Sequence, residues 1–196
     1  MEGFGNEEYR AQRGYNLTFL RRCNLGLPDL TAHLIFWPLA LVGLGVDLWS
    51  KSVIFDWLAK KPGNRVSVID GVLRLMAALN DGAAFGIAAE QHRLLVGISA
   101  AALVVIVAVF LFGSGGRRIV QVALGLFAAG ICGNLWDRIF NGGLVRDFID
   151  VTYWPGRHWP TFNVADSLLC IGVGLLLIAT VFTGRQSSQR RAQQHR

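Results

Sequence analysis

The chain has 196 residues, of which 53% are hydrophobic and only 16% are charged, and its mean hydropathy is +0.42. Since about a quarter of the residues in a soluble domain are charged, this composition excludes an ordinary soluble domain and favours one integral membrane domain. The net charge of +6 lies mostly in the termini and short loops, where basic residues bind anionic lipid headgroups. The chain has no motif that interleaves basic and aromatic residues, so we expect no nucleic-acid partner.

The composition divides the chain into three parts. Residues 1–31 form a mixed polar head, which we expect to be cytoplasmic and which does not have the pattern of a cleavable signal peptide. Residues 32–184 are predicted to form a four-helix membrane domain. Residues 185–196 form a basic tail rich in Gln, Ser and Arg, which we expect to be cytoplasmic and disordered.

Four apolar segments of the membrane domain are long enough to cross a bilayer core, which takes about 20 residues. They cover residues 32–49, 94–113, 119–136 and 164–184. Four crossings place both termini on one side of the membrane. Lys and Arg are nearly balanced between the two sides, but the short turn at Arg117 and Arg118 favours cytoplasmic termini, because short loops follow the positive-inside rule best.

The two connections on the opposite side contain strand and turn signals, at about 60–90 and 140–163. Asp70-Gly71 lies between β-prone runs and predicts a hairpin. A second turn at 141–143 precedes a predicted strand over 144–153. The expected fold is therefore a mainly α membrane protein, with four transmembrane helices and a small extracytoplasmic β-sheet that rests on the outer leaflet.

Polar side chains gather at one end of the predicted spans, and ionisable groups at membrane depth indicate a functional site. Asp47 and Lys51 are four residues apart, so they are either an interfacial ion pair or a support for an active site. Arg138, on the same helical face as Asn134, either reaches toward headgroups, binds a lipid phosphate or braces the site. Asn80 belongs either to a simple turn or to a site that bonds an extended substrate backbone.

Asp147 lies in the predicted strand over 144–153 and Asp166 near the start of the fourth span, and these two residues are the strongest catalytic candidates. Two carboxylates held close together cannot both ionise cheaply, so they share one proton. The ionised carboxylate can then take a proton from water while the protonated one donates to a scissile carbonyl. Each residue alone is more often an interfacial residue than a catalyst, and Asp150 competes with Asp147 for the first position.

The three cysteines, Cys23, Cys132 and Cys170, are odd in number and do not have metal-ligand spacing. We interpret them as small packing residues rather than as a disulfide framework or a zinc site. The sequence predicts no metal site and no cofactor.

Five short motifs in the chain resemble those of the lipoprotein signal peptidases (signal peptidase II), in the order in which that family has them. They are Asp47-x-x-Ser50-Lys51, Asn80-x-Gly82-Ala83-Ala84-Phe85, Gly130-x-x-Gly133-Asn134-x-x-Asp137-Arg138, Asp147-Phe148 and Phe162-Asn163-x-Ala165-Asp166-Ser167. Ser50 stands where threonine is usual, and Ala128, Ala129 and Cys132 depart from the commoner glycine-rich form of the third motif. Each motif is short, but five in order across all four spans are specific.

This resemblance implies an intramembrane aspartyl endopeptidase without a metal. It would cleave the signal peptide from bacterial prolipoproteins on the N-terminal side of a diacylglyceryl-modified Cys, with Asp147 and Asp166 activating water. The residues that would bind substrate or support the dyad are Asp47, Lys51, Asn80, Gly82, Gly130, Asn134, Arg138, Asn163 and Ala165.

The resemblance also implies a location and partners. The protein would be a multi-pass protein of the bacterial cytoplasmic (inner) membrane, with its active site toward the outer leaflet. Its partners would be a diacylglyceryl-prolipoprotein substrate and membrane lipids, and the cyclic peptide globomycin would inhibit it. We expect a monomer, since no feature of the sequence requires more.

Other functions are less consistent with the sequence. A transporter or channel would carry charges inside several spans, whereas here they gather at one end. A rhomboid protease would need Gly-x-Ser-x-Gly and a zinc protease His-Glu-x-x-His, and neither string occurs. A structural membrane subunit without catalytic activity would tolerate substitution of Asp147 and Asp166.

Overall fold

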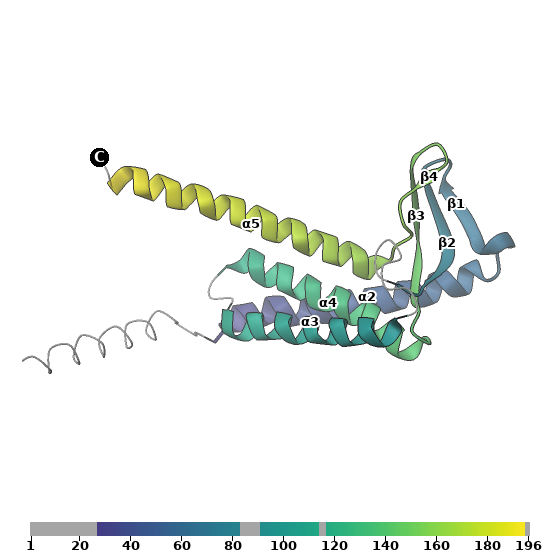
Figure 1. Cartoon of the computed structure of the whole chain (residues 1–196), viewed down its shortest axis with the longest axis horizontal. Coiled ribbons are helices and arrows are strands. Elements are labelled where there is room, and N and C mark those ends of the chain that lie inside the picture. Colours follow the sequence, from purple (N-terminus) through teal and green to yellow (C-terminus); the bar gives the residue numbers. More distant parts are fainter. Residues whose placement is uncertain (1–26, 83–90, 114–116, 195–196) are drawn as a thin grey trace, which may run out of the picture.

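The computed structural model describes residues 27–82, 91–113 and 117–194, with the backbone alone beyond residue 181. Most of the predicted polar head lies outside these residues, as do Ala83–Phe85 of the second motif. Four long helices lie along one direction, and a small sheet lies across one end of them (Figure 1).

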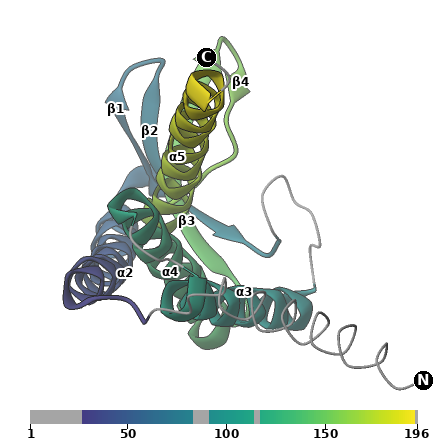
Figure 2. The same ribbon diagram turned by 90° about the vertical axis from the view of Figure 1, so that its left-hand side faces the viewer.

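The helices are α2 (Leu30–Leu58), α3 (His92–Gly113), α4 (Arg118–Phe140) and α5 (Val164–Gln194). Each contains a segment that is long and apolar enough to cross a membrane, in α5 over Val164–Val181. The four predicted spans are therefore confirmed as helices. In the view along the helices, α4 lies between α2, α3 and α5, and it packs against all three (Figure 2).

The first and last helices extend furthest beyond the ends that the sequence predicted. The first was expected to end at Trp49, but α2 continues to Leu58, because Asp47 and Lys51 are buried inside the protein rather than marking the end of the span. The prediction of a disordered tail is wrong for residues 185–194, since α5 runs to Gln194. Its Gln, Arg and Ala residues are good helix formers, so the backbone can continue past Gly184.

The start of α2 is joined to the start of α4 by one acidic residue. Asp29 caps α2 by accepting a hydrogen bond of 2.8 Å from the backbone N–H of Ala32. Its two oxygens also accept bonds of 2.9 Å from Nη1 and Nη2 of Arg118. The hydrogen bond from Arg118 lowers the pKa of Asp29 to about 2, so the carboxylate stays ionised and the contact between the helices persists until the pH falls toward that value.

The four-stranded antiparallel sheet has the order β1-β2-β3-β4. Its strands are β1 (Arg65–Ile69), β2 (Leu73–Asn80), β3 (Val145–Trp154) and β4 (Arg157–His158). The predicted hairpin at Asp70-Gly71 is confirmed, with Gly71 at φ +75°, a conformation that glycine adopts without strain. Central strands β2 and β3 pass over the ends of the helices, and this junction contains the polar residues singled out above.

Candidate active site

An open cavity of about 660 Å³ lies where the ends of α4 and α5 meet strands β2 and β3. Six polar or glycine residues that the sequence singled out contribute to its lining: Asn80, Gly82, Asn134, Arg138, Asp147 and Asp166. The remaining wall is mostly apolar. The structure thus brings together, in one cavity, residues from four separate motifs.

Asp147 projects from β3 and is only 2% exposed. One carboxylate oxygen accepts a 2.9 Å hydrogen bond from Nδ2 of Asn80, and the other accepts a 2.6 Å bond from Nδ2 of Asn163. Burial raises the pKa of Asp147 to about 6, and the charge of Asp166 adds to this rise, while the two amide hydrogen bonds oppose it. The environment therefore favours a proton on Asp147.

Asp166 lies in the first turn of α5, where the helix dipole favours a negative charge. Its oxygens accept hydrogen bonds of 2.8 Å from Nδ2 of Asn134 and 3.1 Å from the backbone N–H of Asn163. In return, Oδ1 of Asn163 accepts a 3.0 Å bond from the backbone N–H of Asp166. This reciprocal pair is the arrangement of a capping box, and it fixes the Asp166 side chain at the helix start.

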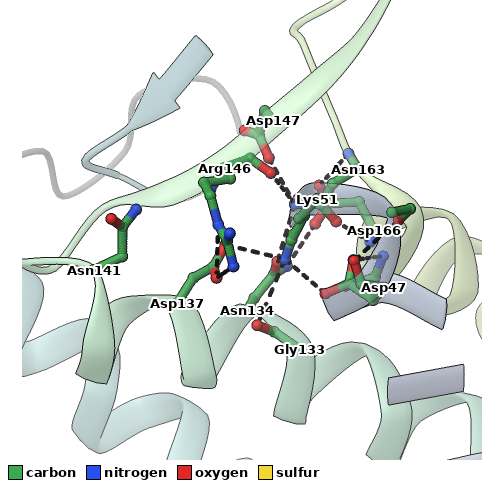
Figure 3. Close-up of polar contacts among 12 residues, drawn as sticks. Asp47, Lys51, Gly133, Asn134, Asp137, Asn141, Arg146, Asp147, Asn163 and Asp166 are labelled. Atoms are coloured by element: carbon green, nitrogen blue, oxygen red, sulfur yellow. Dashed lines mark hydrogen bonds and ion pairs between the residues drawn. The ribbon is translucent and has the colours of Figure 1, made fainter. Parts of the chain in front are cut away.

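Asn163 donates hydrogen bonds to the carboxylates of both Asp166 and Asp147, through its backbone N–H to Asp166 and through its side-chain amide to Asp147 (Figure 3). Its Nδ2 also lies 3.0 Å from Oδ1 of Asn134. A single residue therefore ties the first turn of α5 to β3 and sets the relative positions of the two aspartates.

Lys51 lies beside this network and is completely buried. Its ammonium nitrogen is 2.7 Å from Oδ2 of Asp47 and 3.3 Å from Oδ2 of Asp137. Asp137 in turn pairs with Arg146, whose Nη2 is 2.7 Å from Oδ1 (Figure 3). Two cations and two carboxylates thus neutralise one another inside the protein, as buried charges require. The pair of Asp47 and Lys51 is part of this buried network and does not lie at the lipid surface.

Lys51 also determines how the amide of Asn134 is turned. The ammonium group can only donate, and it donates a 3.0 Å hydrogen bond to Oδ1 of Asn134. The amino group of Asn134 must then point the other way, where it donates to Asp166. The buried cation is therefore connected to a candidate catalytic carboxylate through one amide.

Arg138 and Asn80 are fixed around the same cavity by Gly82. Nη2 of Arg138 donates a 3.0 Å bond to the carbonyl oxygen of Gly82, and Oδ1 of Asn80 accepts a 3.0 Å bond from the N–H of Gly82. Because Oδ1 of Asn80 is occupied, its amino group faces Asp147. Arg138 is half-buried in the cavity wall, so it does not extend to headgroups as the simplest interpretation predicted.

Gly130 and Ala165 let α4 and α5 approach closely enough to form the site. A Cβ on Gly130 would lie 2.6 Å from the carbonyl oxygen of Ala165, closer than atoms can pack. Ala165 is fully buried, and its N–H donates a 2.8 Å bond to Oδ1 of Asp47. These small residues therefore bring the first turn of α5, with Asp166, against α4 and α2.

We expect Gly130→Ala to lower the unfolding free energy by about 1–3 kcal/mol, because the added methyl group meets rigid backbone and overpacks the contact. The change should also reduce activity by displacing the first turn of α5. Thermal unfolding in detergent checks the first effect. Gly174→Ala is the matched control, since a Cβ there meets nothing within 4 Å. Equal stability of the two variants would contradict this account.

The sequence did not single out two residues that the structure places in the network. The sequence predicted only a polar cluster around Asp137 at the helix end, and it predicted no role in the site for Arg146, although Arg146 directly precedes Asp147. Besides its ion pair, Asp137 accepts a 3.0 Å bond from the backbone N–H of Arg146 and so anchors the start of β3. The sequence did contain one signal for Arg146, because it is a charged residue directly beside a candidate catalytic residue.

The competing carboxylate Asp150 is not part of the cavity lining. Its oxygens contact Arg74 and His158 instead of the residues that hold Asp147. Of the cysteines, Cys23 lies outside the described residues, and Cys132 is half-buried. Cys170 is exposed and lines the cavity, so the packing interpretation is wrong for Cys170. Within the described residues, no group of three or more His, Cys, Asp or Glu side chains could hold a metal ion.

Four membrane-spanning helices with two carboxylates lining one cavity at their end are typical of a membrane-embedded enzyme. Two solved structures described as bacterial membrane enzymes have the same fold, both with 34% sequence identity. The first has a TM-score of 0.67 and covers 77% of this chain and 87% of its own. The second has a TM-score of 0.64 and covers 76% of this chain and 92% of its own.

The family model "Signal peptidase (SPase) II" matches residues 39–182. A lipoprotein signal peptidase of Rhodopirellula baltica is 37% identical over 159 residues, which are 74% of this chain and 71% of the relative. One from Halalkalibacterium halodurans is 35% identical over 158 residues, 81% of this chain and 99% of the relative. The chain belongs to the signal peptidase II family, and it is a peptidase of the aspartic type that the five motifs indicated.

Proposed function

We propose that Asp147 and Asp166 form a catalytic dyad that cleaves the signal peptide of bacterial prolipoproteins on the N-terminal side of the diacylglyceryl-modified Cys. The observation that carries this proposal is that both carboxylates line one cavity and are bonded to the same residue, Asn163. The relatives in Rhodopirellula baltica and Halalkalibacterium halodurans are named as lipoprotein signal peptidases, which supports the substrate class.

The environments of the two aspartates favour different roles. Burial favours a proton on Asp147, the more buried of the two, and the helix start favours a negative charge on Asp166. Asp166 takes a proton from water as the hydroxyl oxygen bonds to the scissile carbonyl carbon, and Asp147 donates its proton to the carbonyl oxygen. The carbon–nitrogen bond then breaks. The leaving amine receives the proton from Asp166, and Asp147 recovers its own from the hydroxyl group of the intermediate.

The other residues of the cavity position the substrate. The guanidinium of Arg138 is held by Gly82 at the cavity wall, where its further N–H groups can donate to substrate carbonyl oxygens. Apolar residues such as Leu169 and Ile171 line the part of the cavity along α5, which suits the acyl chains of a lipid-modified substrate. The polar end contains the dyad, so the peptide bond beside the lipidated Cys would meet it there.

This function places the protein in the bacterial inner membrane, with both termini cytoplasmic and the sheet and dyad toward the outer leaflet. The polar head at 1–31 and the tail at 185–196 would then be cytoplasmic. Tryptophan is enriched where a membrane meets water, and five tryptophans toward this end of the protein are between 40% and 66% exposed, which agrees with contact with lipid: Trp49, Trp57, Trp136, Trp154 and Trp159. We propose that the active unit is a monomer.

Purified protein in detergent should cleave a diacylglyceryl-modified prolipoprotein and should be inhibited by globomycin. The control is the same prolipoprotein with an unmodified Cys, which should be cleaved much more slowly because the cavity is mostly apolar. Absence of cleavage by protein that is shown to be folded would contradict the proposed function.

The assignment of the proton to Asp147 predicts the pH dependence of kcat/KM. With a pKa of about 6 in the substrate-free enzyme, Asp147 loses its proton as the pH rises, so kcat/KM should fall above about pH 6. The fall in kcat should occur at higher pH, since bound substrate excludes water and further disfavours the charged form. Initial rates between pH 5 and 9 check this. An increase in kcat/KM with pH through this range would instead make Asp147 the base.

A further inference from the structure

A second buried carboxylate, Asp150 on β3, lies in the sheet outside the dyad and is 2% exposed. Arg74 on β2 contacts one of its oxygens through Nε at 2.7 Å and Nη2 at 2.5 Å. The other oxygen is 3.1 Å from Nδ1 of His158 on β4, and this nitrogen is also 3.1 Å from Oγ1 of Thr152. One carboxylate therefore joins three strands. We call Arg74, Asp150 and His158 the strand clamp.

The strand clamp lies next to one wall of the cavity. His158 is followed directly by Trp159, Pro160, Thr161 and Phe162, and all four line the cavity. We call these four residues the hairpin wall. Backbone hydrogen bonds connect the hairpin wall to β3. The N–H of Trp159 donates to the carbonyl oxygen of Val151 (2.8 Å), and the N–H of Phe162 donates to the carbonyl oxygen of Ile149 (3.0 Å). The strand clamp thus lies at the start of the hairpin wall, and the end of the hairpin wall leads directly into Asn163.

Backbone hydrogen bonds hold the two ends of the hairpin wall on β3, at Trp159 and Phe162, and the side-chain contacts of His158 add to this pairing at the first end. Strand β4 has only two residues, and Pro160 has no N–H to donate. A strand this short is marginal without side-chain contacts. The contacts of Asp150 are charge-assisted, and its side chain is 3% exposed, so they are screened little by water. Side-chain contacts of His158 with Asp150 and Thr152 join β4 to β3, and the ion pair with Arg74 on β2 holds Asp150 in place for this contact.

We propose that the strand clamp positions the hairpin wall against the substrate and so sets substrate affinity rather than the chemical step. The proposal rests on the peptidase function proposed above. It follows from the separation of the two networks, because the side-chain partners of Asp150 are Arg74 and His158, whereas those of the dyad are three asparagines. Loosening the wall should weaken binding and leave the dyad intact.

The test compares His158→Leu with His158→Asn in the full-length protein. Asparagine keeps an N–H close to the place of Nδ1, whereas leucine keeps bulk without a donor. The probe is a fluorescent diacylglyceryl-modified peptide that spans the cleavage site, used for Kd by titration and for KM and kcat by cleavage. We expect His158→Leu and Asp150→Ala to raise Kd and KM about 5- to 20-fold, while kcat stays within about twofold of the wild-type value. The Kd of His158→Asn should stay within about threefold of the wild-type value.

Two controls separate this role from general loss of structure. Asp70→Ala removes the exposed Ser67–Asp70 pair of the β1–β2 hairpin and should change neither constant. Trp159→Ala combined with His158→Leu should raise Kd less than the product of the two single effects, since both act through the same wall. His158 is 37% exposed at its side chain, so its variants should fold even if Asp150→Ala does not.

The outcomes distinguish the strand clamp from the peptidase assignment. Three results would overturn the strand clamp if the wild type still cleaves the peptide. They are an unchanged Kd in His158→Leu, an equal fall in kcat in both His158 variants, or independent effects of the changes at His158 and Trp159. Binding without cleavage by the wild type would contradict the peptidase function, and the Kd comparison would still decide the strand clamp. A wild type that neither binds nor cleaves the peptide would overturn both.

Discussion

Replacing either Asp147 or Asp166 with asparagine should lower kcat by about 10³-fold or more. Asp147→Asn removes the proton donor, and Asp166→Asn removes the group that takes a proton from water. Asparagine matches aspartate in size and keeps one of the two hydrogen bonds at each site, because its oxygen can accept while its amino group faces the second donor. The variants should therefore fold, which thermal unfolding in detergent checks alongside the cleavage rate.

The matched control is Asp56→Asn, an exposed aspartate on α2 that does not line the cavity. It should retain wild-type kcat. If either dyad variant is folded and keeps more than about a tenth of wild-type kcat, the corresponding aspartate is not a catalytic residue. Comparable losses in all three variants would point to a general sensitivity of the protein to charge.

Lys51→Met should lower the unfolding free energy by about 3–5 kcal/mol, the cost of leaving buried charges without their partner. Methionine has a similar length but no charge, so Asp47 loses its cation and Asp137 keeps only Arg146. The amide of Asn134 also loses the donor that orients it, so kcat should fall even at temperatures where the variant is folded. Unfolding and cleavage are measured on the same preparation.

A second variant separates the charge from the shape of the side chain. Adding Asp47→Asn to Lys51→Met removes both members of the closest buried ion pair and should restore part of the lost stability. Lys60→Met, on an exposed lysine just beyond the same helix, should have little effect on stability. A double variant less stable than Lys51→Met alone would mean that the ion pair is not what stabilises this part of the protein.

Local patterns were sufficient to predict the helices and the first hairpin. The spans follow from apolar length, and the hairpin follows from Asp70-Gly71 between β-prone runs. The same reasoning ended the first helix too early, because a charged residue in an apolar segment normally indicates the membrane boundary. Lys51 is tolerated inside the protein only because Asp137 and Asp47 neutralise it, and Asp137 comes from another helix.

The candidate dyad was identified mainly through the family resemblance, since each aspartate alone was consistent with an interfacial residue. The choice between Asp147 and Asp150 depends on the pairing of β2 with β3, which includes an irregularity between Leu75 and Ala78. Three residues along one strand separate the two carboxylates, but their partners are entirely different. Pairing across distant segments of this kind is not encoded in any local pattern.

The bridging role of Asn163 was predictable only in part. Its spacing of three residues from Asp166, at the start of an apolar helix, is a capping pattern that the sequence shows. Its bond to Asp147 depends on β3 passing over the end of α5, which is a tertiary contact. The strand clamp was not predicted for the same reason, since Arg74, Asp150 and His158 come from three strands.

The most direct measurement is mass spectrometry of the products formed by the purified protein from a diacylglyceryl-modified prolipoprotein, with and without globomycin. Two products are expected: a free signal peptide, and a lipoprotein whose first residue is the diacylglyceryl-modified Cys. Neither should form when globomycin is present or when Asp147 or Asp166 is asparagine. Cleavage at another peptide bond, or the same products from the asparagine variants, would contradict the proposed site and its chemistry.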